Sequence, residues 1–152
     1  MQQILLIVLS VIIVGVAIAV GITMFKSQAV TSNRQAVITD LNSFAGQALG
    51  FYKTPIDFGG GGYTWTGDGT DDQNLGAWLG YGHDGTTGDT LTTENGTYKL
   101  IIDADKLTIT GNGKEIGDKA GYPATAFGAD GCVAAQVVVT GKTGAIKFTR
   151  LN

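Results

Sequence analysis

The chain has 152 residues, of which 43% are hydrophobic and 15% charged, and its formal net charge is −3. This length suits one globular domain plus one extra element, and the single Cys132 excludes an intrachain disulfide and a cysteine-based zinc site. Residues 1–53 carry three bases and one acid, 54–98 seven acids and no base, and 99–152 seven bases and five acids. An acidic middle between two mildly basic ends argues against nucleic-acid binding.

The first expected element is an apolar helix. The 22 residues from Ile4 to Phe25 contain no charge, and their only polar side chains are Ser10 and Thr23. A helix of this length, at about 1.5 Å per residue, spans the roughly 30 Å hydrocarbon core of a bilayer. Its start has no basic residue and the run exceeds the about 7–15 apolar residues of a cleavable secretory signal, so we do not expect cleavage. Segment 1–25 therefore needs lipid, or burial by other protein on every side.

Segment 26–53 is expected to continue the same helix with one apolar face. Six hydrophobic residues recur at spacings of seven, four, three, four and three, which is typical of a helical stripe that packs on a core: Val30, Val37, Leu41, Phe44, Ala48 and Phe51. Polar residues between them, including Asn33 and Asp40, are assigned to a solvent-facing side. Because Pro55 disfavours the helical conformation at Thr54, the helix should run from about Gln2 to Tyr52.

The predicted helix is much longer than the domain that it carries. It would extend about 75 Å, whereas a domain of about 100 residues has a radius of gyration of about 13 Å. The apolar half must therefore project beyond the globular part of the chain.

Segment 54–96 is predicted to be an ordered but irregular loop region. It contains Gly59-Gly60-Gly61-Gly62 and closely spaced further glycines, which leave no room for long helices. Large aromatic side chains are expected to attach this region to the core: Tyr63, Trp65, Trp78 and Tyr81.

Two local patterns in this region indicate candidate sites. Asp68, Asp71 and Asp72 lie in a glycine-rich loop and would offer the oxygen ligands that calcium prefers, although the glutamate of an EF-hand is missing. The alternative interpretation is that these aspartates form turns. Asn95-Gly96-Thr97 matches the acceptor pattern for N-glycosylation, with Asn95 as the modified residue.

Segment 97–152 is predicted to form an antiparallel β-sheet. Thr97–Asp103 and Lys106–Thr110 form one hairpin, and Cys132–Thr140 and Ala145–Leu151 form a second one around a turn at 141–144. Four strands with one apolar face need a cover, and the helical stripe of 26–53 provides it. The expected fold class is α+β, with a long N-terminal helix packed by its second half on a small antiparallel sheet.

Catalytic activity is not expected. His83 is the only histidine, and no serine or cysteine pattern around it indicates a catalytic triad. Gly141-Lys142-Thr143 resembles the end of a phosphate-binding loop, but the glycine required five residues earlier is Gln136 and a strand is expected to follow. We expect no cofactor other than the candidate calcium ion.

The N-terminal half resembles the helix of type IV pilins and pseudopilins. The resemblance lies in Ile4-Leu5-Leu6-Ile7-Val8-Leu9, Gly15-Val16-Ala17-Ile18-Ala19 and Phe25-Lys26, and the succession of helix, loop and sheet matches the family over the whole chain. The resemblance implies an extracellular helical homopolymer on the cell surface. Before assembly, its subunits would be embedded in the cytoplasmic membrane, from which a pilus-type assembly machinery would take them. The implied filament-core positions are Ile4, Leu5, Val8, Ile12, Gly15, Ala19, Ile22 and Phe25.

Three features depart from the family pattern. Leu5 stands where pilins usually have a glutamate that pairs with a neighbour's N-terminal amine, and Gly15 and Gly21 occur where many pilins have a helix-breaking proline. The family's basic leader is not visible, so either Met1 is the first mature residue or the subunit is processed differently. A competing hypothesis is a single-pass membrane-anchored module that binds a glycan or calcium through the loop region. It would usually have basic residues on the cytoplasmic side of the span and a flexible linker after it. The sequence has no basic residue before Ile4, and the expected helix continues directly after Phe25.

Overall fold

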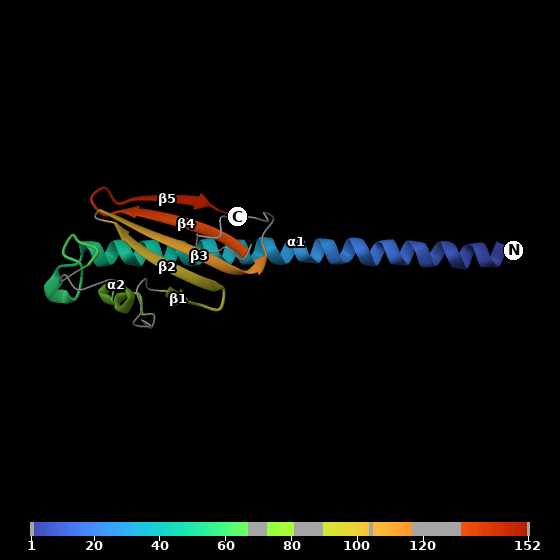
Figure 1. Ribbon diagram of the computed structural model, residues 1–152, viewed down its shortest axis with the longest axis horizontal. Coiled ribbons are helices and arrows are strands. Elements are labelled where there is room, and N and C mark those ends of the chain that lie inside the picture. The colour runs from blue at the N-terminus through green and yellow to red at the C-terminus, as the bar shows by residue number, and fades with distance from the viewer. Residues whose placement is uncertain (1, 67–72, 81–89, 104, 117–131, 152) are drawn as a thin grey trace.

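A computed structural model describes residues 2–66, 73–80, 90–103, 105–116 and 132–151. These residues form an α+β fold with one long helix and a five-stranded antiparallel sheet (Figure 1). In chain order, the elements are α1 (Gln2–Lys53), the 3-10 helix η1 (Ile56–Phe58), α2 (Gln73–Trp78), β1 (Thr90–Thr92), β2 (Gly96–Asp103), β3 (Lys106–Ile116), β4 (Cys132–Thr140) and β5 (Ala145–Arg150).

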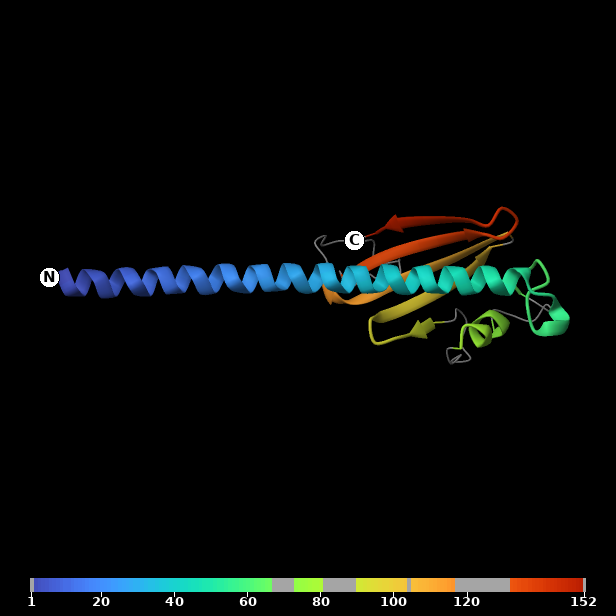
Figure 2. The ribbon, with the colours of Figure 1, turned by 180° about the vertical axis from the view of Figure 1, so that it is seen from behind.

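Helix α1 has two halves with different surroundings. Its first half projects away from the rest of the protein, and its second half lies along one face of the sheet (Figures 1 and 2). The helix ends at Lys53, one residue beyond the expected end. The Thr54 hydroxyl donates a hydrogen bond of 2.8 Å to the Gly50 carbonyl there, and Pro55 prevents the helix from continuing.

The sheet is a simple meander in the order β1-β2-β3-β4-β5. Both predicted hairpins are confirmed, since Asp103 lies opposite Lys106 and Thr140 lies opposite Ala145. The structure adds β1, and it extends β3 to Ile116.

The expectation of an irregular loop throughout 54–96 is corrected, because α2 and β1 lie within that segment. Both elements are too short to be recognised from local periodicity. They form because Leu75, Leu79 and Leu91 bury their side chains in the common core.

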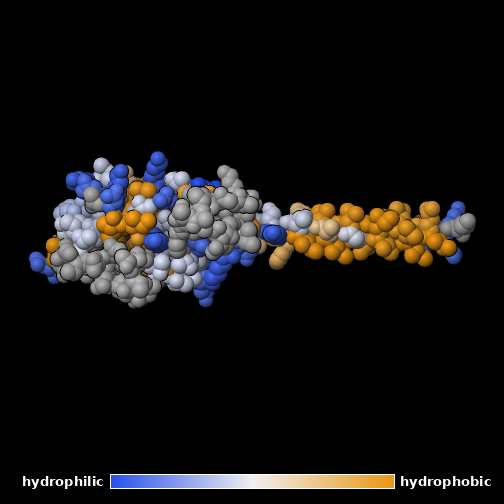
Figure 3. Space-filling model, in the orientation of Figure 1, coloured by the Kyte–Doolittle hydropathy of each residue, from blue (hydrophilic) through white to orange (hydrophobic). Residues whose placement is uncertain are grey.

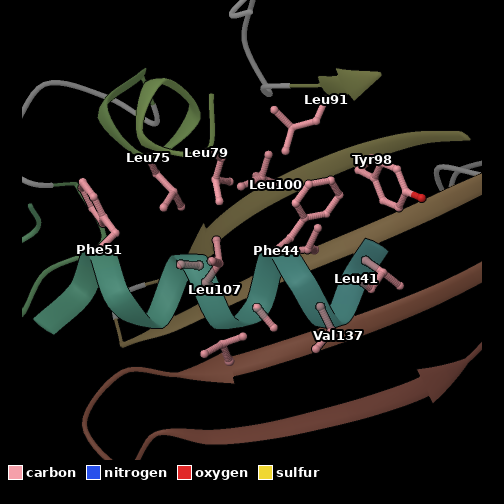
Figure 4. Packing of buried hydrophobic residues seen from close by; sticks show 14 of the residues in the cluster. Leu41, Phe44, Phe51, Leu75, Leu79, Leu91, Tyr98, Leu100, Leu107 and Val137 are labelled. Carbon is pink, nitrogen blue, oxygen red and sulfur yellow. The ribbon is translucent and has the colours of Figure 1, made fainter. Parts of the chain in front are cut away.

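The core lies between the second half of α1 and the inner face of the sheet (Figure 4). All six predicted stripe residues are buried, and five of them belong to the main hydrophobic cluster, whereas Val30 lies outside it. The sheet contributes Tyr98, Leu100, Leu107, Ile109, Val137 and Val139. Two helix residues that the stripe did not include, Ala45 and Tyr52, are also buried.

Glycines in β3 and in the β4–β5 turn allow the helix to approach closely. A Cβ atom at Gly111 would lie 2.7 Å from the Tyr98 ring and 2.9 Å from a methyl group of Val37. A Cβ at Gly141 would overlap the ring of Tyr52. These glycines therefore set the distance between α1 and the sheet, which fixes the direction in which the apolar half projects.

Candidate functional site

The first half of α1, residues 2–25, exposes its hydrophobic side chains on all sides, and we call it the rod. Every large hydrophobic residue between Ile4 and Phe25 is 49–76% exposed, and Figure 3 shows the projecting rod as predominantly hydrophobic. The filament-core candidates lie on this rod: Ile4, Leu5, Val8, Ile12, Gly15, Ala19, Ile22 and Phe25. The rod is thus long and apolar enough to cross a membrane, and its hydrophobic window is not buried by the rest of the chain.

The two polar side chains between Ile4 and Phe25 are satisfied within the helix. The Ser10 hydroxyl donates to the Ile7 carbonyl at 2.8 Å, and the Thr23 hydroxyl donates to the Val20 carbonyl at 2.8 Å. Hydroxyl groups bonded in this way do not need water. The rod can therefore be transferred from water to lipid or protein without leaving these two donors unpaired.

Pairs of small residues occur on the surface of the rod. Gly15 and Ala19, and likewise Ala17 and Gly21, are four residues apart, and a Cβ atom at Gly15 or Gly21 would meet nothing within 4 Å. Small residues at this spacing allow helices to approach closely in an apolar environment.

A polar cluster fixes the second half of α1 to the sheet. The Asp40 carboxylate accepts hydrogen bonds from the Tyr98 hydroxyl at 2.7 Å, from Asn95 Nδ2 at 3.0 Å and from the Thr93 hydroxyl at 3.3 Å. Asn33 extends this cluster by donating to the Asn95 carbonyl at 3.1 Å. This assignment corrects the expected solvent-facing role of Asn33 and Asp40, which are half-buried against the strand connections.

The same cluster contains the candidate glycosylation residue. Asn95 is half-buried, and its Nδ2 atom, where a glycan would be attached, lies against Asp40. Modification of Asn95 stays a prediction, and it would have to be accommodated within this contact. The more direct role of Asn95 is to hold the β1–β2 connection on the helix.

We expect Asp40→Ala to lower the free energy of unfolding by about 1.5–3 kcal/mol, because the hydrogen bonds that Tyr98, Asn95 and Thr93 donate to a charged group are lost. Urea unfolding of the full chain in detergent would measure this. The control is Asn42→Ala, an exposed position on the same helix. Equal unfolding midpoints for the two variants would contradict a structural role for the cluster.

The aromatic residues of segment 54–96 have different roles. Trp65 is buried and its ring centroid lies 4.7 Å from that of Tyr52, so it attaches the segment to α1 as expected. Trp78 contacts Phe51 edge to face at 5.9 Å. Tyr63 instead exposes most of its side chain although its ring also touches Tyr52.

The calcium candidates Asp68, Asp71 and Asp72 lie outside the described residues, as do Tyr81 and His83. Within the described ranges, no group of three or more histidine, cysteine or acidic residues is arranged to hold a metal ion. The calcium site therefore stays a prediction.

The pattern that resembles a phosphate-binding loop forms the β4–β5 turn. Lys142 Nζ donates to Asp105 Oδ2 at 2.8 Å. That hydrogen bond, together with the attraction of the carboxylate, raises the pKa of the Lys142 ammonium. Strand β5 follows the turn in place of the helix that a phosphate-binding loop needs.

No protein-family model, curated protein or solved structure matches the chain. Among the described residues, the exposed rod is the feature with the largest physical consequence.

Proposed function

We propose that the chain is a structural subunit of a pilus-like helical filament, held in a membrane before assembly and displayed on the cell surface afterwards. The observation that carries this proposal is the rod of residues 2–25, which is about 36 Å long and hydrophobic on every side. The described residues of the rest of the chain do not cover it. A pilus-type assembly machinery would move it from lipid into contact with identical rods.

The free energy cost of exposing apolar surface to water determines whether the rod can stay in water or has to be surrounded by lipid or protein. Removal of apolar surface from water contributes about 25 cal/mol per Å². If burial of the rod removes roughly 1,000–2,000 Å² in all, the gain is about 25–50 kcal/mol before ordering costs. A surface salt bridge contributes only about 0–1 kcal/mol, so Leu5 in place of a glutamate leaves most of this driving force intact.

The continuity of α1 favours a repeating assembly over an anchored monomer. The helix runs without interruption from the rod into the head, defined as residues 26–151, whose core includes Phe44 and Phe51. The orientation of the head relative to the rod is therefore fixed. Identical rods that pack together would place their heads at equivalent positions, which is what a helical polymer requires.

Electron microscopy of material sheared from the cells that make the chain tests the proposal. We expect filaments that contain this chain, with a core of packed helices and the heads on the outside. Purification of the detergent-extracted chain provides the comparison. If it occurs in cells only as single copies in the membrane and sheared material contains no filaments, the proposal is wrong, and the membrane-anchored binding module is favoured.

A further inference from the structure

The head has a second exposed hydrophobic feature at the end of α1. We call residues Pro55–Tyr63 the tip knob; it lies at the opposite end of the helix from the N-terminus (Figure 1). Phe58 is 77% exposed and Tyr63 72%, and Ile56 is also exposed. Three neighbouring large hydrophobic side chains in solvent are typical of a contact surface.

The tip knob is held rigidly despite its exposure. Backbone amides of Gly61, Gly62 and Tyr63 each donate a 2.8 Å hydrogen bond back to α1 or to Thr54 just after it. Tyr63 has a φ of 67°, a left-handed conformation that is uncommon for any residue except glycine. Backbone strain retained at an exposed aromatic residue motivates a functional hypothesis, because a preorganised surface loses less entropy on binding.

The complementary surface is the edge strand β5. All six residues of Ala145–Arg150 are exposed, and β5 is the last strand of the sheet. Ile146 and Phe148 lie opposite the buried Val139 and Val137, so they extend the hydrophobic inner face of the sheet beyond the part that α1 covers. We call Ala145–Arg150 the β5 surface.

The two surfaces differ in charge. The tip knob carries the exposed Asp57 and no base. On β5, Arg150 lies opposite the buried Ala135 and so shares a face of the strand with Ile146 and Phe148. Lys147 lies on the other face. Charges of opposite sign select partners and set their orientation at an interface with a hydrophobic centre. Both surfaces are exposed in the single chain, so neither covers the other within one copy.

The length of α1 indicates which occupant can reach the tip knob. Residues 26–53 extend about 42 Å, so the knob lies far outside a membrane that holds the rod. Rods that overlap in a filament core must be offset along the axis by less than their own length of about 36 Å. Such an offset places the knob of one copy beside the head of another copy.

We propose that the tip knob of one copy docks on the β5 surface of a neighbouring copy. This inference rests on the proposed filament function and identifies a second contact that joins the heads. The contact is heterologous, because two different surfaces of the same chain meet, and heterologous contacts that do not close produce open helical polymers. The rods would supply most of the burial, and the knob contact would fix the angle between successive heads.

Disulfide trapping in cells tests this contact with the full chain. The background is Cys132→Ala, which removes the native thiol, and Phe58→Cys is combined with Phe148→Cys. On oxidation we expect a ladder of covalent multimers that disappears on reduction. Each single cysteine variant should give no covalent dimer, because the contact joins unlike surfaces and the same position does not meet itself in a neighbouring copy. Phe58→Cys combined with Thr92→Cys is the matched control, since Thr92 is an exposed residue on the opposite edge of the sheet.

The outcomes separate this inference from the proposed function. Filaments that yield no ladder, or a ladder of equal intensity in the Thr92→Cys control, overturn the knob contact and leave the filament intact. Absence of filaments in the unsubstituted chain overturns both. Ile56→Cys with Ile146→Cys repeats the test at neighbouring exposed positions, so that one unsuitable cysteine geometry does not decide the result.

Discussion

Ile12→Asp is expected to abolish filament assembly and to weaken the partitioning of the rod into the membrane without releasing the chain. Ile12 lies near the middle of the rod and is exposed on its surface. A carboxylate near the centre of a membrane-spanning helix costs about 2.5–3.5 kcal/mol, which is roughly a hundredfold change in partitioning. The same charge inside a core of packed rods would be buried without a partner, a cost that each added copy repeats.

The measurements are the fraction of chain that stays with washed membranes and the number of filaments seen by electron microscopy. Thr39→Asp is the matched control, because it places the same carboxylate on the exposed side of α1 within the head. The control should retain membrane association and assembly. If Ile12→Asp assembles as well as Thr39→Asp does, the rod is not the filament core.

Phe44→Ala is expected to lower the free energy of unfolding of the head by about 3–5 kcal/mol, the usual cost of truncating a buried phenylalanine. Phe44 is fully buried, and its ring meets Tyr98 edge to face at a centroid distance of 4.9 Å. Removal of the ring leaves a cavity between α1 and β2. Urea unfolding in detergent, followed by tryptophan fluorescence of the buried Trp65, would measure the loss.

Phe58→Ala is the control for this experiment, because it makes the same chemical change at a side chain that is mostly exposed. Its unfolding midpoint should stay close to that of the unsubstituted chain. Similar losses at both positions would contradict the argument that burial between α1 and the sheet is what makes Phe44 costly to truncate.

Several elements could be predicted from the sequence because their signals are local and repeated. The hydrophobic stripe of α1 spans several turns, and each of its residues falls on the buried side. The two hairpins have turns that separate clear strand patterns, and the registers at Asp103–Lys106 and Thr140–Ala145 follow from them. The filament-core positions and the calcium ligands stay predictions, since the first depend on neighbouring copies and the second lie outside the described residues.

Other features depended on contacts between distant segments. The three residues of β1 and the six of α2 are too short to show a period, and they are recognised only by what they bury. Asp40 looked like a solvent-facing residue because helical spacing cannot reveal that Thr93, Asn95 and Tyr98 approach it from the sheet. Tyr63 looked like a core anchor because composition alone does not determine which aromatic residue of a loop turns outward.

The sequence by itself determined that this chain has an uncharged rod longer than its head can cover, because helix length and hydrophobicity add residue by residue and need no tertiary contact. Only the tertiary structure decided the direction in which that rod projects from the head and which surfaces of the head are exposed to solvent. These depend on the close packing of α1 on Gly111 and Gly141, on the Asp40 cluster and on the hydrogen bonds that hold the tip knob. Each of these joins residues that are distant in the sequence or held in unusual backbone conformations, so no local pattern specifies them.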